Sequence, residues 1–260
     1  MKRVAIIGCG AIGGVIARAV DQGSVRAELV ALMDARPDAC RELASRLERS
    51  RPAITSRLED VLALNPDIVV EAASQEAVRE YAKRILERSD LLVLSVGALM
   101  EEQTLRELLE VARRSGRRIY VPAGAAGGLD VLKAYSQVGV SRLKLVTRKP
   151  AKSLGAEVQG PTVVFRGRAS EAVKAYPKSL NVAATLSLAA GVEAEVEVVA
   201  DPSLSRNVHE VVAESPAGRV RVTLENVPSP ENPKTSYLAA LSAVRVLKEI
   251  CSAEGGLVIL

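Results

Sequence analysis

The chain has 260 residues, 48% of them hydrophobic, which is enough to bury the core of one large domain or two modest ones. Its 35 basic and 31 acidic residues leave a net charge of only +4 and are interspersed, and aromatic residues make up 2%. Nucleic-acid binding, which needs a basic face and often stacking aromatics, is therefore not expected.

A membrane protein and a metalloprotein are also not expected. No apolar run approaches the roughly 20 residues of a membrane span, and the first strand pattern begins too near residue 1 to leave room for a signal peptide. Cys9, Cys40 and Cys251 are scattered without metal-ligand or redox spacing, so neither zinc nor disulfides are expected. We expect a cytoplasmic protein without a metal.

The first 34 residues predict a strand, a glycine turn, a helix, a second strand and an acid. Val4–Ile7 is an apolar run that suits a strand buried on both faces, Ala11–Val20 has helical apolar spacing, and Leu29–Met33 predicts another strand. Residues 8–13 between the first strand and the helix read G-x-G-x-x-G, and Asp34 follows the second strand. This order is typical of a dinucleotide-binding unit.

Each glycine has a physical role in that interpretation. Gly8 permits the tight turn, Gly10 lets the backbone approach a pyrophosphate, and Gly13 allows the helix to pack closely on the strand. The phosphates then lie at the positive end of the helix dipole. A purely structural glycine turn is the alternative, but the flanking elements disfavour it. The predicted cofactor contacts of this half of the chain are Gly8, Gly10, Ala11, Ile12, Gly13 and Asp34.

The choice of dinucleotide depends on two residues. Asp34 would bond the ribose hydroxyls of NAD and repel the 2′-phosphate of NADP. Arg36 follows two residues later and would receive that phosphate if Asp34 turned away. We expect NAD, with NADP possible.

The rest of the first half repeats the alternation of helix and buried strand. We therefore predict an α/β fold with a Rossmann-type doubly wound parallel sheet, whose ligands lie at the carboxyl ends of the strands. This domain covers residues 1–124 and is completed by the C-terminal helix within 234–260. Its further elements are helices Pro37–Arg49, Gln75–Ser89 and Glu101–Ser115 and strands Asp67–Glu71, Leu91–Ser95 and Arg118–Val121.

The pattern changes after Gly128. Alternating apolar and polar residues predict half-exposed antiparallel strands, so residues 125–233 form a second α+β domain with a largely antiparallel sheet, assigned to catalysis and dimerisation. The strands are Leu143–Arg148, Thr162–Arg166, Glu193–Ala200 and Arg219–Glu225, with one helix at Ala183–Ala190 between them, and the last long helix, Ser236–Cys251, follows the domain.

Four polar segments of the second half carry the predicted chemistry. They cover residues 121–130, 176–189, 201–211 and 225–247, and they contain four of the five asparagines and the single histidine. His209 has the side chain whose unperturbed pKa lies near neutrality, so it is the natural proton carrier beside a hydride transfer. A structural strand histidine is the alternative, and Lys234 is the rival amine base.

These segments resemble the L-aspartate dehydrogenase family. The motifs GA-x-GG-x-D, NVAAT, RN-x-HE and NPKTS occur here in that order. The resemblance implies that Ala125 and Asn181 contact the cofactor, that His209 is catalytic and that the enzyme is a homodimer built on its second domain. It also implies NAD(P)-dependent oxidative deamination of L-aspartate to iminoaspartate, which gives oxaloacetate and ammonia or feeds quinolinate and NAD synthesis.

A dicarboxylate substrate needs cations and hydrogen-bond donors. The predicted substrate set is Thr185, Asn207, Lys234, Thr235 and Ser236, with Arg206 as a further possibility. Two alternatives stay open at this point. One is an NAD(P)-dependent cyclic-imine reductase of the dihydrodipicolinate reductase type, although such enzymes carry paired histidines; the other is a non-catalytic NAD-binding sensor.

Overall fold

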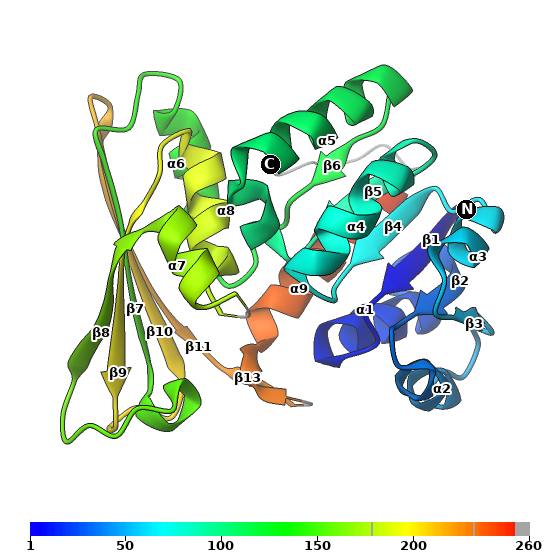
Figure 1. The fold of residues 1–260 in the computed structure, drawn as a ribbon, viewed down its shortest axis with the longest axis horizontal. Coiled ribbons are helices and arrows are strands. Elements are labelled where there is room, and N and C mark those ends of the chain that lie inside the picture. Colours follow the sequence, from blue (N-terminus) through cyan, green and yellow to red (C-terminus); the bar gives the residue numbers. More distant parts are fainter. Residues whose placement is uncertain (178, 231, 253–260) are drawn as a thin grey trace. The chain divides into compact units, whose positions relative to one another are not determined.

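The computed structural model describes residues 1–177, 179–230 and 232–252, apart from the side chains of 232–234. The chain divides into two compact units (Figure 1). Unit 1 comprises Met1–Pro122 and the described residues from Ala240 onward, and unit 2 comprises Ala123–Ala239. Among the described residues, no helix combines the length and apolar character that crossing a membrane requires.

Unit 1 is built on a six-stranded sheet in the order β3-β2-β1-β4-β5-β6, and every pairing in it is parallel. The order reverses at β1, and sheets of this kind bind their ligands beyond the carboxyl ends of the strands at that point, here β1 and β4. The strands are β1 (Lys2–Ile7), β2 (Ala27–Met33), β3 (Ala53–Thr55), β4 (Ile68–Glu71), β5 (Asp90–Val93) and β6 (Ile119–Tyr120).

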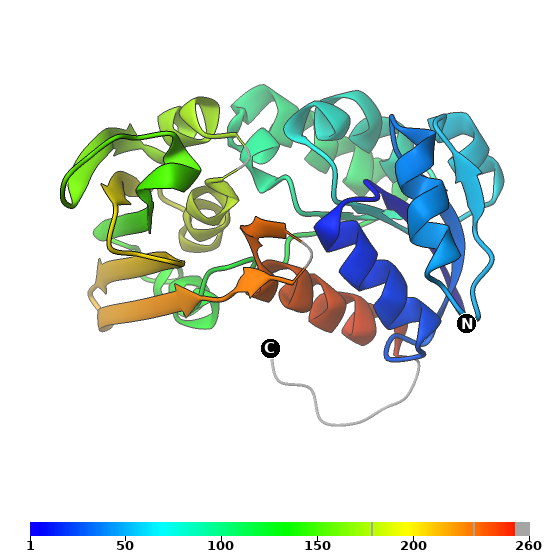
Figure 2. The ribbon, with the colours of Figure 1, turned by 90° about the horizontal axis from the view of Figure 1, so that it is seen from below.

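Helices cover both faces of this sheet because its central strands are apolar on both sides. One face packs on α1, α2 and the C-terminal helix α9, and Figure 2 shows α1 and α9 side by side. In α9, Ala243, Leu247 and Cys251 are buried in this core. The helices are α1 (Ala11–Asp21), α2 (Pro37–Ser45), α3 (Leu58–Ala63), α4 (Gln75–Leu86), η1 (Val96–Met100), α5 (Glu102–Ser115) and α9 (Tyr237–Cys251).

Unit 2 is built on a five-stranded sheet in the order β11-β10-β7-β9-β8. The pair β7 and β9 is parallel, and the other pairs are antiparallel. The strands are β7 (Arg142–Pro150), β8 (Thr162–Arg168), β9 (Glu195–Asp201), β10 (Asn207–Ser215) and β11 (Gly218–Asn226), and a separate hairpin joins β12 (Pro228–Ser229) to β13 (Asn232–Ser236). The fold class predicted from the sequence is confirmed.

The two faces of the five-stranded sheet differ. Helices lie against one side, which we call the inner face, and the side chains that point to it are buried at alternate positions of β7 and β10 (Figure 1). The outer face carries charged side chains together with valines of β7 and β10. The helices are α6 (Leu129–Tyr135), α7 (Ala169–Ala175), α8 (Asn181–Ala190) and the short η2 (Ala151–Leu154).

Some elements differ from the sequence prediction. β3 was missed because its three residues are exposed or half-exposed and therefore carry no buried pattern. β10 was missed as a strand because the polar segment before it obscured its alternation. The helix predicted for Pro37–Arg49 ends at Ser45, and the strand predicted for Arg118–Val121 shrinks to Ile119–Tyr120. α6 and α7, with seven residues each, were too short to stand out from their loops.

Candidate active site

The glycine turn of unit 1 is shaped by backbone contacts. Gly8 has φ +100°, and a Cβ on it would lie 2.5 Å from the Ala72 carbonyl oxygen. A Cβ on Gly13 would lie 1.9 Å from the Gly8 carbonyl oxygen. A Cβ on Gly10, by contrast, would meet nothing within 4 Å. Gly8 and Gly13 are thus required by the packing of the turn, whereas the backbone at Gly10 is open to an approaching group.

This open side faces the start of α1. Gly10 is the N-cap residue and provides no side-chain cap, and the first turn of the helix contains no acidic residue. Ala11 and Ile12 are only partly buried. A helix N-terminus without its own anion is suited to a phosphate group, so these residues fit the pyrophosphate of a dinucleotide.

Asp34 ties the glycine turn to the end of β2. Its carboxylate accepts hydrogen bonds from the backbone N–H groups of Cys9, at 2.9 Å, and Arg36, at 2.9 Å. The Arg36 guanidinium is exposed and lies 4.0 Å from the same carboxylate. Each Asp34 carboxylate oxygen accepts one of these backbone hydrogen bonds and keeps a lone pair for a further donor, and the Arg36 guanidinium lies beside it.

Cysteine contacts that the sequence spacing did not predict support the same turn. The sulfur atoms of Cys9 and Cys40 lie 2.9 Å apart, and both residues are free cysteines. Burial raises the pKa of both thiols, so they are neutral. The pair anchors the turn to α2.

Glu71, at the end of β4, organises the neighbouring loops. Its buried carboxyl group accepts hydrogen bonds from the backbone N–H groups of Ala73, Ser74 and Ser95 and from the Ser95 hydroxyl. Burial raises the pKa of Glu71, and these four donors oppose that rise. The loops after β4 and β5, where ligands of such sheets bind, are therefore held in place by one side chain.

In unit 2, His209 lies on the inner face of β10. It is 3% exposed, and its Nδ1 lies 3.1 Å from the Thr147 hydroxyl, directly across the β10–β7 pair. Its Nε2 makes no hydrogen bond within the part of the chain that the structure describes. The imidazole is thus fixed at one nitrogen and available at the other.

The protonation of His209 differs from the sequence expectation. Burial, with the charge of Lys149 as the second cause, lowers the pKa of His209 to about 3. The expectation that this residue titrates near neutrality is therefore wrong. At neutral pH the ring is an uncharged imidazole that can accept a proton.

Further polar side chains share this end of the inner face, and we call them the inner polar cluster: Thr147, Lys149, Asn207, His209 and Asn226. Thr147 and Lys149 alternate on β7, Asn207 and His209 alternate on β10, and Asn226 opposes Asn207 on β11. The sequence did not single out Thr147 or Lys149. Lys149 is 5% exposed, and burial lowers the pKa of its amine to about 8.

The 123–128 loop contacts the same cluster. The side-chain amide of Asn226 donates to the Ala125 carbonyl oxygen at 3.4 Å, and Ala125 is buried. Gly128 has φ +77°, and a Cβ on it would lie 3.1 Å from the Val222 side chain. The loop therefore lies against β11, which places Ala125 beside the inner polar cluster.

The other predicted residues of unit 2 lie on α8 and on the β12–β13 hairpin. Asn181 begins α8, and the Thr185 hydroxyl donates to its carbonyl oxygen at 3.0 Å, so Thr185 can donate to a substrate only if that bond breaks. Thr235 is half-buried. The Ser236 hydroxyl is buried without a hydrogen-bond partner among the described residues. The Lys234 side chain lies outside the described part of the chain.

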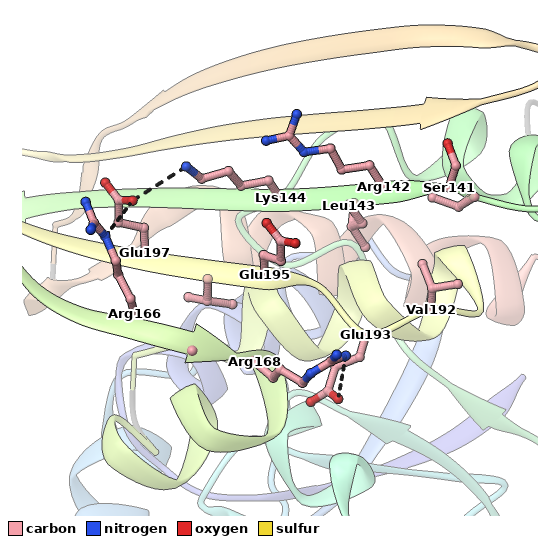
Figure 3. A pocket seen from close by; sticks show the side chains of 13 residues that line it. Ser141, Arg142, Leu143, Lys144, Arg166, Arg168, Val192, Glu193, Glu195 and Glu197 are labelled. Atoms are coloured by element: carbon pink, nitrogen blue, oxygen red, sulfur yellow. Dashed lines mark hydrogen bonds and ion pairs between the residues drawn. The ribbon is translucent and has the colours of Figure 1, made fainter.

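A separate hollow of about 720 Å³ lies on the outer face of the same sheet (Figure 3). Five of the seven charged side chains that line it pair with one another. Glu197 contacts Lys144 at 3.5 Å and Arg166 at 3.2 Å, and Arg168 contacts Glu193 at 3.9 Å. None of the predicted site residues lines this hollow.

Comparison with known proteins identifies the family. A family model described as "Aspartate dehydrogenase, C-terminal" matches residues 130–250, and one described as "Homoserine dehydrogenase, NAD binding domain" matches residues 8–122. L-aspartate dehydrogenases of Methanosarcina barkeri and Methanothermobacter thermautotrophicus are 45% and 44% identical to this chain, covering 97% and 96% of it and 98% and 96% of their own lengths. The chain belongs to the L-aspartate dehydrogenase family.

Solved structures agree with membership of the L-aspartate dehydrogenase family. The crystal structure of aspartate dehydrogenase from Thermotoga maritima is 30% identical, has a TM-score of 0.75 and covers 98% of this chain and 99% of its own. An amine dehydrogenase from Mycobacterium smegmatis, at 13% identity and a TM-score of 0.58, shares the fold alone. Membership identifies an oxidoreductase with a pyridine-nucleotide cofactor, and it removes the cyclic-imine reductase and sensor alternatives.

Proposed function

We propose that the protein catalyses the NAD(P)-dependent oxidative deamination of L-aspartate. The balanced reaction takes L-aspartate, NAD⁺ and water to oxaloacetate, ammonium, NADH and a proton, through iminoaspartate. The observation that carries the proposal is the buried imidazole of His209, uncharged and held by Thr147 in a chain of the L-aspartate dehydrogenase family. We place the reaction in the cytoplasm, as expected from the sequence.

His209 is the proposed proton acceptor. We assign the Nδ1 proton to a hydrogen bond with the Thr147 hydroxyl oxygen, which leaves the lone pair of Nε2 as the basic site. Nε2 removes a proton from the substrate α-ammonium and releases it to solvent, and it then takes a proton from the water that attacks the imine and passes it to the departing ammonia. The nicotinamide, when bound, accepts the hydride from Cα.

Residues of both units are assigned to cofactor binding. Gly8, Gly10 and Gly13, with Ala11 and Ile12 at the start of α1, are proposed to hold the pyrophosphate, since only the Gly10 side of the turn is open. Asp34 is proposed to read the ribose and to favour NAD over NADP. In unit 2, Ala125 and Asn181 are the proposed contacts.

The substrate assignment rests on hydrogen-bond capacity. Asn207 belongs to the inner polar cluster, and the buried hydroxyl of Ser236 has no partner among the described residues. Both suit a carboxylate. Thr235 and Lys234 belong to the same motif and stay in the proposed set, whereas Thr185 contributes only after its bond to Asn181 opens.

We also propose that the enzyme is a homodimer built on unit 2 and that its iminoaspartate supplies quinolinate for NAD synthesis. The outer face of the five-stranded sheet, which none of the described helices of unit 2 covers, supports the first part (Figure 1). Sedimentation or light scattering of the purified protein measures the oligomeric state. A monomer at working concentration would contradict it.

The function is tested by following NADH formation from NAD and L-aspartate. We expect turnover with L-aspartate, none with D-aspartate, and the reverse reaction with oxaloacetate and ammonium. NADH binding, measured in parallel by fluorescence, shows that the protein is folded and competent. A protein that binds NADH but neither oxidises L-aspartate nor aminates oxaloacetate would exclude the proposed function.

A further inference from the structure

Lys149 is a buried cation that has no counter-ion among the residues that the structure describes. It is 5% exposed on the inner face of β7, where it opposes Ala200 of β9. Its amine has one hydrogen bond in the described part of the chain, a long one of 3.5 Å to the Ser179 carbonyl oxygen. The nearest acid of β9, Asp201, follows Ala200 and accepts its hydrogen bonds from Ser203. No ion pair involves Lys149 among the described residues.

Burial of the Lys149 ammonium without a counter-ion lowers the stability of the folded protein. A buried ammonium without a carboxylate loses its hydration and gains little in return, and one carbonyl at 3.5 Å does not replace three hydrogen bonds to water. A methionine of similar length would fill the same space without that penalty. The charge is therefore better explained by an anionic ligand that binds beside Lys149.

The surroundings of Lys149 indicate what that group is. Thr147 precedes it by two residues on the same face, so the Lys149 Cα lies roughly 7 Å along the strand from the residue that holds His209. Ser179 immediately precedes the N-terminal end of α8, which has no side-chain cap and no acid in its first turn. Two positive features, an ammonium and a helix N-terminus, thus meet beside the proposed base.

We propose that Lys149 binds a carboxylate group of the dicarboxylate substrate, next to His209. This role extends the substrate set expected from the sequence motifs, in which Lys149 has no place. It rests on the proposed function for the identity of the substrate. It requires only that a carboxylate oxygen come within hydrogen-bond distance of Nζ, on the inner face of unit 2.

The test uses Lys149→Met, Lys149→Arg and, as a matched control, Lys133→Met on the exposed surface of α6. Succinate serves as a dicarboxylate probe that cannot react, and its affinity for the enzyme with NADH bound is measured by calorimetry. Loss of one charge-assisted hydrogen bond should weaken succinate binding about 10- to 100-fold in Lys149→Met and raise KM for L-aspartate by a similar factor. NADH affinity should stay within about twofold.

The melting temperature separates this role from a structural one. Lys149→Met removes an unpaired buried charge, so it should melt at or above the temperature of the wild type while binding succinate poorly. Lys149→Arg should retain more succinate affinity than Lys149→Met, and Lys133→Met should match the wild type. Succinate affinity and KM within about threefold of the wild type in Lys149→Met would overturn the proposal.

The calorimetric arm also separates failure of this proposal from failure of the proposed function. A wild type that does not oxidise L-aspartate refutes the function, yet succinate binding that depends on Lys149 would still support the carboxylate site. A wild type that turns over L-aspartate, with a Lys149→Met variant of equal affinity, refutes the carboxylate site alone.

Discussion

Acidification should destabilise the wild-type protein more than a His209→Asn variant. Burial lowers the pKa of His209 to about 3 in the folded protein, against an ordinary value of about 6.5 in the unfolded chain. Between these two pH values the unfolded chain binds a proton that the folded protein does not, so stability is fully present above about pH 6.5 and is lost as the pH falls towards 3. Each pH unit within this window costs about 1.4 kcal/mol.

The expected magnitude between pH 7 and pH 5 follows directly. Integrated over this interval, the proton linkage of His209 amounts to about 2 kcal/mol. Asparagine does not titrate, yet it can keep a hydrogen bond to Thr147. Carboxylates such as Asp21 titrate in both proteins and cancel in the comparison.

Urea unfolding at the two pH values measures the effect. The free energy of unfolding of the wild type should fall by about 2 kcal/mol more than that of His209→Asn, with equal m-values in both proteins. A difference below about 0.5 kcal/mol between the two proteins would refute the reasoning, because it would mean that His209 is not held uncharged by burial.

Three further predictions test the site by substitution. His209→Asn should lower kcat by about 10² to 10⁴ with NADH affinity nearly unchanged, and a variant that keeps more than a tenth of wild-type kcat would show that His209 is structural. Thr147→Val should also lower kcat, and Thr147→Ser should restore it. Asp34→Asn should lower the ratio of kcat/KM with NAD to kcat/KM with NADP by about tenfold, whereas Arg36→Ala should raise this ratio. Equal changes in kcat/KM for both cofactors would contradict the assignment. Gly13→Ala should abolish NADH binding measured by fluorescence, since its Cβ would lie 1.9 Å from the Gly8 carbonyl oxygen, and retained affinity would show that the turn can adapt.

Unit 1 was predictable because its signals are local. The apolar run of β1, the glycines and the acid after β2 lie within 34 residues, and each requirement of the turn falls on a residue that meets it. The order β3-β2-β1-β4-β5-β6 is the usual order of dinucleotide-binding sheets, so it follows once the glycine turn and its flanking elements are recognised as such a unit. β3 and the Cys9–Cys40 contact were not predictable, since one has no buried pattern and the other depends on how α2 packs.

The site of unit 2 was harder to predict from the sequence, because it depends on the register in which its strands pair. His209 could be chosen by residue type, but Thr147 lies 62 residues away and becomes its partner only through the pairing of β10 with β7. A shift of one residue in that pairing would turn every side chain of one strand to the other face. The pKa of His209 could not be predicted either, since burial is a property of the packed sheet.

The sequence pattern does indicate that Lys149 is buried, although its charge suggests an exposed position. The segment Arg148-Lys149-Pro150 resembles a solvated strand end, yet Lys149 continues the buried alternation of Leu143, Leu145 and Thr147. A cation at such a position is either paired or reserved for a ligand, and here no acid shares its face in the described part of the chain. The repulsion between Lys149 and a protonated His209 links the two residues. A carboxylate bound at Lys149 would cancel that repulsion, so the proton affinity of His209 rises when the substrate is in place.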